Sequence, residues 1–222
     1  MIGKLKKYVR ERRLLSFDRS KRMESDSLLS AFDQKKAIFV HIPKTAGLSV
    51  VESVFGTHGG HRTAVYYRKV FDKEFEQYFK FTFIRNPWDR LYSAYRFLEA
   101  GGVNKHDKQA FEMHLGNCQS FEDFVMNWLD KKMIFKIIHL FPQSYFLVGN
   151  KGELLVDYVG RFESLQDDFQ HIVQKLSLEI TLPHVNKTKR KDSYQLAYTK
   201  GMIEKVARIY QEDISRFSYT FK

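Results

Sequence analysis

The sequence is poor in cysteine and in long apolar runs, and each shortage excludes a class of protein. Its one cysteine, Cys118, cannot form an intramolecular disulfide, which excludes a disulfide-stapled secreted domain and favours a reducing compartment. No stretch approaches the roughly 18 apolar residues of a membrane-spanning helix. The first residues also lack the apolar core of a signal peptide. We therefore expect a soluble, cytoplasmic protein.

Four prolines and twelve glycines form no linker that would divide the chain, and no internal repeat is visible. With 222 residues, 43% of them hydrophobic and 15% aromatic, the chain is long enough to bury one full core. We expect a basic lead-in over residues 1–35 and a single domain over residues 36–222. The net charge of +11 favours a partner with phosphate, sulfate or carboxylate groups, without selecting one of them.

The first 17 residues, MIGKLKKYVRERRLLSF, place five aliphatic side chains among six basic ones. This pattern permits an amphipathic helix on anionic lipid, which would give peripheral contact with the inner membrane surface. A solvated basic arm is the simpler interpretation, and the sequence leaves both open.

Strand and helix patterns alternate along the chain. Strands are expected over residues 37–42 and 79–84. The second leads into a helix that Asn86 caps, Pro87 begins and Gly101-Gly102 ends. Further helices are expected from Ser120 and over residues 164–176 and 203–217, with a strand-turn-strand over residues 144–162. Together these elements predict a three-layer α/β domain with a mainly parallel sheet flanked by helices.

In such a sheet, ligands bind beyond the carboxyl ends of the strands. The first of these ends reads HIPKTAGLS (41–49). Gly47 allows close backbone approach, Thr45 and Ser49 offer hydroxyls, and Lys44 adds a positive charge beside a helix N-terminus. Such a turn suits phosphate or sulfate, but it is not a Walker A loop, because Lys44 precedes the glycine. Taken alone, it is equally compatible with an ordinary strand-turn-helix.

The second strand end favours an anion site over an ordinary strand-turn-helix. Arg85 closes the strand, and Ser93 lies about two helical turns further on, so a guanidinium and a hydroxyl can converge on another anionic group. Two anion sites on neighbouring strand ends suggest a nucleotide that is phosphorylated at two places.

The segments HIPKTAGLS (41–49) and FTFIRNPWDRLYSAY (81–95) resemble the two cofactor signatures of sulfotransferases that use 3'-phosphoadenosine-5'-phosphosulfate. The resemblance is strongest to the carbohydrate branch, which includes glycosaminoglycan 2-O-sulfotransferases and shorter bacterial members. It extends to VDYVGRFESLQDDF (156–169) and LPHVNKTKRKD (182–192). It implies a P-loop-NTPase-like fold and a metal-free reaction that leaves adenosine 3',5'-bisphosphate.

By the same resemblance, the first turn surrounds the 5'-phosphosulfate, and the second turn binds the 3'-phosphate together with a basic loop that folds over the nucleotide. Leu48 stands where a threonine or serine is common, so we expect only a backbone donor there. The residues implied are Lys44, Thr45, Ala46, Gly47, Leu48 and Ser49 for the phosphosulfate, and Arg85, Ser93, Lys187, Lys189 and Arg190 for the 3'-phosphate.

Sulfuryl transfer is an in-line displacement in which negative charge builds on the bridging oxygen of the departing nucleotide. Lys44 is our candidate to stabilise that charge. The acceptor hydroxyl needs a base, and the segment GTHGGHRTAVYY offers His58 and His61. We favour His61, because it resembles a glycine-preceded histidine of uronyl 2-O-sulfotransferases, whereas His41 is expected to be structural.

Three further side chains are weaker candidates around the acceptor. Glu52, one helical turn after the phosphosulfate loop, is the next candidate base, and Gln143 and Ser144 fall where family members line the acceptor cleft. The expected acceptor is a carbohydrate, as an acidic polysaccharide or a glycolipid. Its identity and the oligomeric state stay open.

Two alternatives compete with this interpretation. A P-loop-like nucleotide kinase predicts a Walker A lysine and an acidic magnesium ligand, and neither is seen. A non-catalytic polyanion-binding protein would explain the charge but not two placed anion turns, and nucleic-acid fold signatures are missing. Eight histidines without an HExxH pattern give no reason to expect a metal.

Overall fold

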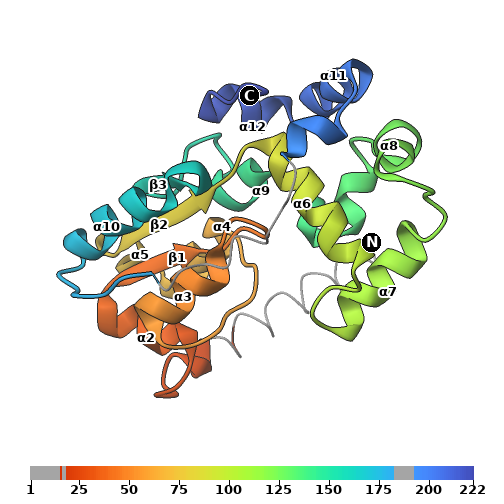
Figure 1. Cartoon of the computed structure of the whole chain (residues 1–222). Helices are drawn as coiled ribbons and strands as arrows, with labels where there is room; N and C mark the ends of the chain where they lie inside the picture. Colours follow the sequence, from red (N-terminus) through yellow and green to blue (C-terminus); the bar gives the residue numbers. More distant parts are fainter. Residues whose placement is uncertain (1–15, 17–18, 183–192) are drawn as a thin grey trace.

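The computed structural model describes residue 16 and residues 19–182 and 193–222. Three short parallel strands form its sheet in the order β1 (Ala37–Val40), β2 (Phe79–Ile84) and β3 (Tyr158–Arg161) (Figure 1). Ala37 pairs with Phe79, and Ile84 pairs with Arg161. All three carboxyl ends therefore meet at one edge of the sheet, which is where both predicted anion turns begin. The expected α/β fold, with a parallel sheet flanked by helices, is confirmed.

Strands β1 and β2 are buried on both faces, as expected for a parallel sheet that helices cover on both sides. All four residues of β1 are buried, and so are five of the six in β2. The helices near the sheet are α2 (Leu28–Lys35), α3 (Gly47–Phe55), α4 (Ala64–Phe71), α5 (Lys73–Gln77), α9 (Gln143–Leu147) and α10 (Leu165–Lys175). In Figure 1, α2 and α3 lie together beside β1, while α10 lies beside β3.

Packing begins before residue 36, where we had expected the domain to start. The side chain of Phe32, on α2, is completely buried and makes edge contacts with the rings of Phe55 and Tyr67. The Ser27 hydroxyl caps α2 by accepting the N–H of Ser30 at 3.0 Å. The α2 helix therefore packs against the core through its buried residues Leu29, Ser30 and Phe32.

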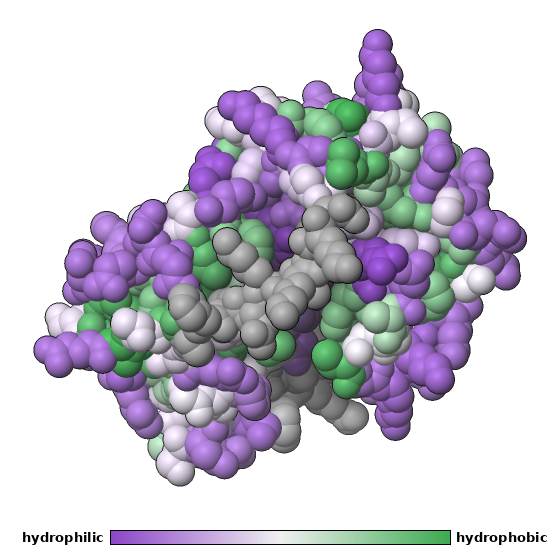
Figure 2. Space-filling view, viewed as in Figure 1, coloured by the Kyte–Doolittle hydropathy of each residue, from purple (hydrophilic) through white to green (hydrophobic). Residues whose placement is uncertain are grey.

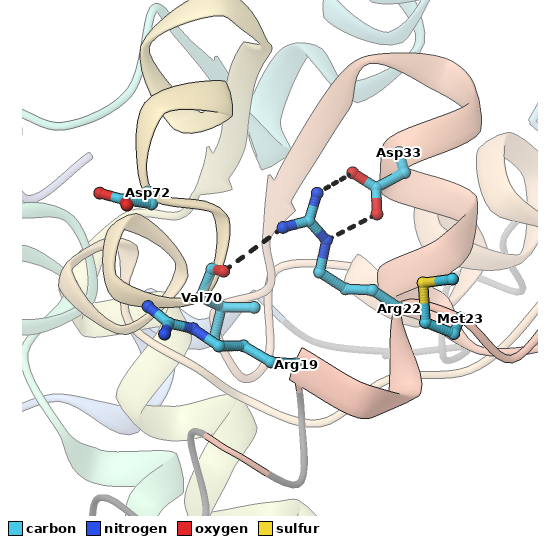
Figure 3. A pocket seen from close by; sticks show the side chains of 6 residues that line it. All are labelled: Arg19, Arg22, Met23, Asp33, Val70 and Asp72. Carbon is cyan, nitrogen blue, oxygen red and sulfur yellow. Dashed lines mark hydrogen bonds and ion pairs between the residues drawn. The ribbon is translucent and has the colours of Figure 1, made fainter.

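Two arginines join the segment before α2 to α4 (Figure 3). Arg22 donates two hydrogen bonds of 2.7 Å to the Asp33 carboxylate and one of 3.5 Å to the Val70 carbonyl. Arg19 donates to the carbonyl of Lys69 at 2.6 Å. Because the bonds to Val70 and Lys69 span 48 and 50 residues, they hold distant segments of the chain together.

A second group of helices lies beyond α6 (Pro87–Glu99), which runs from the sheet edge into that group (Figure 1). As predicted, Asn86 caps α6 by accepting the N–H of Trp88 at 3.1 Å, and Gly101 and Gly102 end it with positive φ. The group contains α7 (Lys105–His114), α8 (Phe121–Asp123), the π-helical η1 (Phe124–Trp128), the 3-10 turns η2 (Met133–Lys136) and η3 (Ile138–Leu140), and α11 (Lys200–Ile209).

The strand-turn-strand expected over residues 144–162 is only partly right. Its turn closes as predicted, since the N–H of Gly149 donates to the Glu153 carbonyl at 2.8 Å. The first strand is wrong: residues 143–147 form α9, whose first two N–H groups donate to the buried Asp213 carboxylate. A distant carboxylate thus supplies the cap that converts a strand-like apolar segment into a helical turn.

The C-terminal apolar repeat forms two helices rather than one: α11 ends at Ile209, Tyr210 lies between the two helices, and α12 (Gln211–Phe217) follows. The remaining short 3-10 turns are η4 (Phe162–Ser164) and η5 (Tyr194–Ala197). On the face in Figure 2, hydrophilic residues dominate both ends of the molecule, and apolar residues form small separate patches. Within the described part of the chain, every helix is too short or too polar to cross a bilayer.

Candidate active site

The turn after β1 has the backbone of an anion-binding loop. Lys44 and Ala46 both adopt left-handed conformations, with φ of 70° and 66°. Ala46 is also the N-cap of α3, so the N–H groups of Gly47, Leu48 and Ser49 have no acceptor within their own helix. Left-handed residues among right-handed ones turn successive N–H groups toward one concave side. The geometry therefore suits phosphate or sulfate.

Some side chains of this turn hold the loop closed, and others are exposed to solvent. Thr45 is completely buried, and its hydroxyl donates to the carbonyl of Ile42 at 2.9 Å, so it holds the turn together. The Leu48 side chain is 52% exposed, and Ser49 is half-buried. The hydroxyl that we expected from Thr45 is thus used within the turn, which leaves Ser49 as the half-buried hydroxyl of the loop.

Gly47 is required by its neighbour His41. A Cβ atom on Gly47 would lie 1.9 Å from Cδ2 and 2.2 Å from Nε2 of the His41 ring. His41 is buried and stacks on Phe39, so the ring has little room to move. The glycine therefore admits a histidine ring, which the sequence alone did not indicate.

Arg85, at the end of β2, joins the second turn to the first. Its Nε and Nη2 each lie 2.7 Å from Oδ2 of Asp89, and its Nη1 donates to the carbonyl oxygen of Lys44 at 3.1 Å. Its guanidinium carbon lies 3.9 Å from the ring centroid of Phe162. Ser93 is half-buried one turn beyond Asp89, on the same face of α6. Arg85 therefore links the two turns that the sequence predicts as anion sites.

Gln143 and Ser144, which the resemblance placed in the acceptor cleft, occupy a different position. Both are buried. The Gln143 amide accepts the N–H of Arg85 at 2.9 Å and donates to the Arg85 carbonyl at 2.9 Å. The Ser144 N–H is held by Asp213 at 2.8 Å. The structure therefore makes Gln143 a clamp on the backbone of Arg85 and corrects the acceptor-cleft assignment of both residues.

Arg90 is a buried link that sequence reasoning missed. Its Nε donates to the Pro43 carbonyl at 2.9 Å and its Nη2 to the His139 carbonyl at 3.3 Å. Burial lowers the pKa of this guanidinium. The sequence did contain a signal for this role, because Arg90 is the second arginine of RNPWDR and lies near the start of a helix that packs in the core. Arg90 fixes the first turn to η3.

Three histidine rings gather beside the first turn. The ring centroids of His41 and His61 are 4.3 Å apart, and those of His61 and His139 are 6.1 Å apart. Nδ1 of His61 lies 3.0 Å from the His41 carbonyl oxygen, and Nε2 of His139 lies 3.9 Å from Oδ1 of Asp107. His139 and Asp107 come from η3 and α7, and no short-range pattern pointed to them.

Burial lowers the pKa of all three histidines. It lowers the pKa of His41 to about 3 and that of His139 to about 4, the latter against the opposing charge of Asp107. Burial also lowers the pKa of His61, against its hydrogen bond to the His41 carbonyl. The positive charge of Lys44 further lowers the pKa of His61 and that of His139. All three rings are neutral at pH 7.

The Lys44 ammonium lies over an aromatic ring, with Nζ 3.8 Å from the ring centroid of Phe97 on α6. The other candidate bases lie on the surface: Nδ1 of His58 and Oε1 of Glu52 pair at 3.0 Å, and their side chains are 75% and 50% exposed. Among the candidates, His61 is the one in the cluster with Lys44.

Lys187, Lys189 and Arg190, which the resemblance implies at the 3'-phosphate, lie outside the described residues. Within the described ranges, no group of three or more His, Cys, Asp or Glu side chains is arranged to hold a metal ion.

Comparisons with known proteins identify relatives of the chain. Carbohydrate sulfotransferase 10 of Homo sapiens and that of Pongo abelii are each 26% identical to the chain over 178 residues, which cover 66% of this chain and 48% of theirs. An uncharacterized protein of Archaeoglobus fulgidus is 30% identical over 128 residues, 57% of this chain and 91% of that protein. No solved structure matches significantly.

The chain therefore spans about half the length of the two carbohydrate sulfotransferases. A model of the sulfotransferase family matches residues 29–220, a range that contains both anion turns, the histidine cluster and the Arg85 clamp. On that match, the chain belongs to the sulfotransferase family.

Proposed function

We propose that this sulfotransferase moves the sulfuryl group of 3'-phosphoadenosine-5'-phosphosulfate to a hydroxyl of a carbohydrate. One observation carries the proposal: Arg85 bonds the Lys44 carbonyl at 3.1 Å, so the two anion turns form one site with two positive side chains. A donor with a phosphosulfate at one end and a phosphate at the other needs two such turns at a fixed separation. A ligand with one phosphate needs only one.

The residues present fit this donor. Donors suited to the 5'-phosphosulfate are the N–H groups of Gly47, Leu48 and Ser49 and the charge of Lys44. Arg85 and Ser93 suit the 3'-phosphate, since both belong to the strand end and helix face that follow β2. When bound, the donor supplies the sulfuryl group and departs as adenosine 3',5'-bisphosphate.

We propose His61 as the base. The His41 carbonyl oxygen can only accept a hydrogen bond, so Nδ1 of His61, 3.0 Å away, carries the proton. Nε2 then keeps its lone pair and can take the proton of the acceptor hydroxyl. Because burial lowers the pKa of His61, the ring is neutral and ready to accept that proton at pH 7.

Lys44 has the complementary role. Its ammonium lies beside the histidine cluster, and its backbone forms part of the anion loop. A fixed positive charge next to the bridging oxygen stabilises the negative charge that builds there in the transition state. Loss of one such electrostatic contact costs enzymes about 100- to 1000-fold in turnover.

The carbohydrate acceptor rests on the relatives, two of which are carbohydrate sulfotransferases. The net charge of +11 favours an acidic glycan or glycolipid. We further propose that the protein acts in the cytoplasm, where its basic N-terminal segment would allow peripheral contact with anionic lipid.

Thermal unfolding with two nucleotides tests the donor. Adenosine 3',5'-bisphosphate at 100 times its Kd should raise Tm by about 5–10 °C, and ATP with magnesium should raise it less. A larger shift with ATP and magnesium would favour a nucleotide kinase. A shift with heparin but none with the bisphosphate would favour a polyanion-binding protein.

Transfer itself is tested with labelled donor and a panel of glycans. His61→Ala should abolish transfer while the Kd for the bisphosphate stays within about threefold of wild type, because the base does not hold the nucleotide. The matched control is His106→Ala, at an exposed histidine of α7. Near-normal turnover in His61→Ala would rule out its role as the base.

A further inference from the structure

One face of α6 connects the two halves of the site. Asp89, Ser93 and Phe97 follow one another at intervals of four residues, so their side chains lie in a row along the helix. At the sheet end of this row, Asp89 holds the Arg85 guanidinium at 2.7 Å. Four residues beyond Ser93, the ring of Phe97 lies under the Lys44 ammonium at 3.8 Å.

Lys44 is therefore held at both ends by the segment that follows β2. Its carbonyl oxygen accepts a hydrogen bond from Arg85 at 3.1 Å, and its ammonium rests on the ring of Phe97. The backbone of Lys44 is left-handed, with φ of 70°, which sets the direction in which its side chain leaves the loop. Contact with the ring then contributes to where the ammonium lies.

The same ring also faces the histidine cluster. The ring centroids of Phe97 and His139 are 5.0 Å apart, and His139 in turn lies 6.1 Å from His61. Phe97 thus contacts the lysine on one side and a neighbour of the base on the other. It is half-buried, so solvent screens the contact with Lys44 only in part.

We infer that Phe97 is a positioning residue that holds the Lys44 ammonium ready for the leaving group through a cation–π contact; this inference rests on the proposed function. An aromatic face attracts a cation through its quadrupole and leaves its charge unneutralised. A carboxylate at this place would form an ion pair with Lys44, and that ion pair would have to break before the charge could act on the donor. The ring holds the ammonium with a weaker and neutral contact.

The contact can be observed without any reaction. In protein labelled with ¹³C at the lysine ε-carbon, the Lys44 ε-protons should resonate upfield of the other lysines, because they lie over a ring face. Lys44→Arg identifies the resonance by its disappearance. Phe97→Met, a substitution of similar volume, should return it to the position of the other lysines, and Phe97→Tyr should keep it upfield. An unshifted Lys44 resonance in the wild-type protein would overturn the inference.

The role in transfer is tested by fluorinating the ring, which weakens its quadrupole while its shape is nearly kept. Replacing Phe97 by mono-, di- and trifluorophenylalanine should lower kcat stepwise, by about three- to tenfold over the series. The KM for the donor should change little. Phe121, which is also half-buried but packs on Tyr92, Tyr95, Phe124 and Tyr198, is the matched site at which fluorination should leave kcat unchanged.

A flat kcat across the Phe97 series, or an equal decline at Phe121, would overturn the inference and leave the proposed function intact. Absence of transfer by the unaltered protein would instead overturn the proposed function, and with it any role of Phe97 in the reaction. The two failures are therefore distinguishable.

Discussion

Nη1 of Arg85 donates a hydrogen bond to the carbonyl oxygen of Lys44 across 3.1 Å, so the strand end of β2 fixes the loop that follows β1. The same guanidinium makes two contacts of 2.7 Å with Asp89, and its backbone is clamped by the Gln143 amide. One arginine thus shapes the first turn while it belongs to the second. A substitution of Arg85 should therefore weaken the contacts of the protein with both ends of a bound nucleotide.

Arg85→Lys should weaken binding of adenosine 3',5'-bisphosphate by about 10- to 100-fold, since a single ammonium cannot replace a planar fork that reaches Asp89 and Lys44 together. Isothermal titration calorimetry measures the change. Arg96→Lys is the control, because Arg96 pairs at 2.8 Å with Glu99 and its side chain is 59% exposed. An unchanged Kd in Arg85→Lys would remove this residue from the nucleotide site.

The proposed base predicts where activity is lost in acid. Burial lowers the pKa of His61 below its ordinary value of 6.5. The base acts only when it is neutral, so kcat/KM should stay constant as the pH is lowered through 6.5 and should fall only at lower pH. Rate measurements between pH 5 and 8 give this limb, with the folded fraction measured alongside. A limb centred at or above pH 6.5 would contradict the assignment of His61.

The two anion turns could be predicted because each is a local pattern. In HIPKTAGLS and RNPWDRLYS, strand, turn and helix start lie within about ten residues, and the helix-capping rules act over the same distance. The cap at Asn86, the helix begun by Pro87 and the parallel strands before both turns were therefore all accessible from the sequence.

What surrounds the turns depends on contacts between distant segments. Gln143 reaches Arg85 over 58 residues, and Asp213 caps α9 over 70. The apolar pattern of residues 144–148 suits a strand as well as a short helix, and the Asp213 carboxylate favours the helix because it accepts its first two N–H groups. The same holds for His139 and Asp107, which join His61 through packing of α7 and η3 that no local period reveals.

Gly47→Ala should disturb both the fold and the cluster. The new Cβ would lie 1.9 Å from the His41 ring, so the ring must shift and its 4.3 Å packing on His61 must change. We expect a loss of about 1–3 kcal/mol in the free energy of unfolding, together with a large loss of transfer. The comparison is Gly201→Ala within α11, where the nearest atom to a new Cβ is 3.8 Å away.

Gly201→Ala should stabilise the protein by about 0.5–1 kcal/mol, because alanine is the better helix former. Urea unfolding of the three proteins gives the values. If Gly47→Ala kept the stability and transfer activity of the wild type, the His41 ring would be able to move without loss of free energy. The close packing of Gly47 against His41 would then be contradicted.

The buried histidines also set how stability depends on pH. In the unfolded chain a histidine has its ordinary pKa of 6.5, whereas in the folded protein burial lowers the pKa of His41 to about 3 and that of His139 to about 4. Between pH 6.5 and the lowered pKa of each histidine, the unfolded state binds a proton that the folded state does not bind, so acid favours unfolding. Stability should be fully present above pH 6.5 and should fall as the pH decreases toward 4. At pH 5, each of the two histidines should lower the free energy of unfolding by about 2 kcal/mol relative to pH 7.

Urea unfolding at pH 7 and pH 5 measures this loss, and variants assign it. In His41→Phe and His139→Gln, the difference in unfolding free energy between the two pH values should shrink by about 2 kcal/mol each. Taking the difference within one variant cancels the fixed cost of the substitution. His106→Asn, at an exposed site, should leave the difference as in the wild type. If neither buried variant reduced the difference, the acid sensitivity would have to come from other groups, and His41 and His139 would titrate in the folded protein much as they do in the unfolded chain.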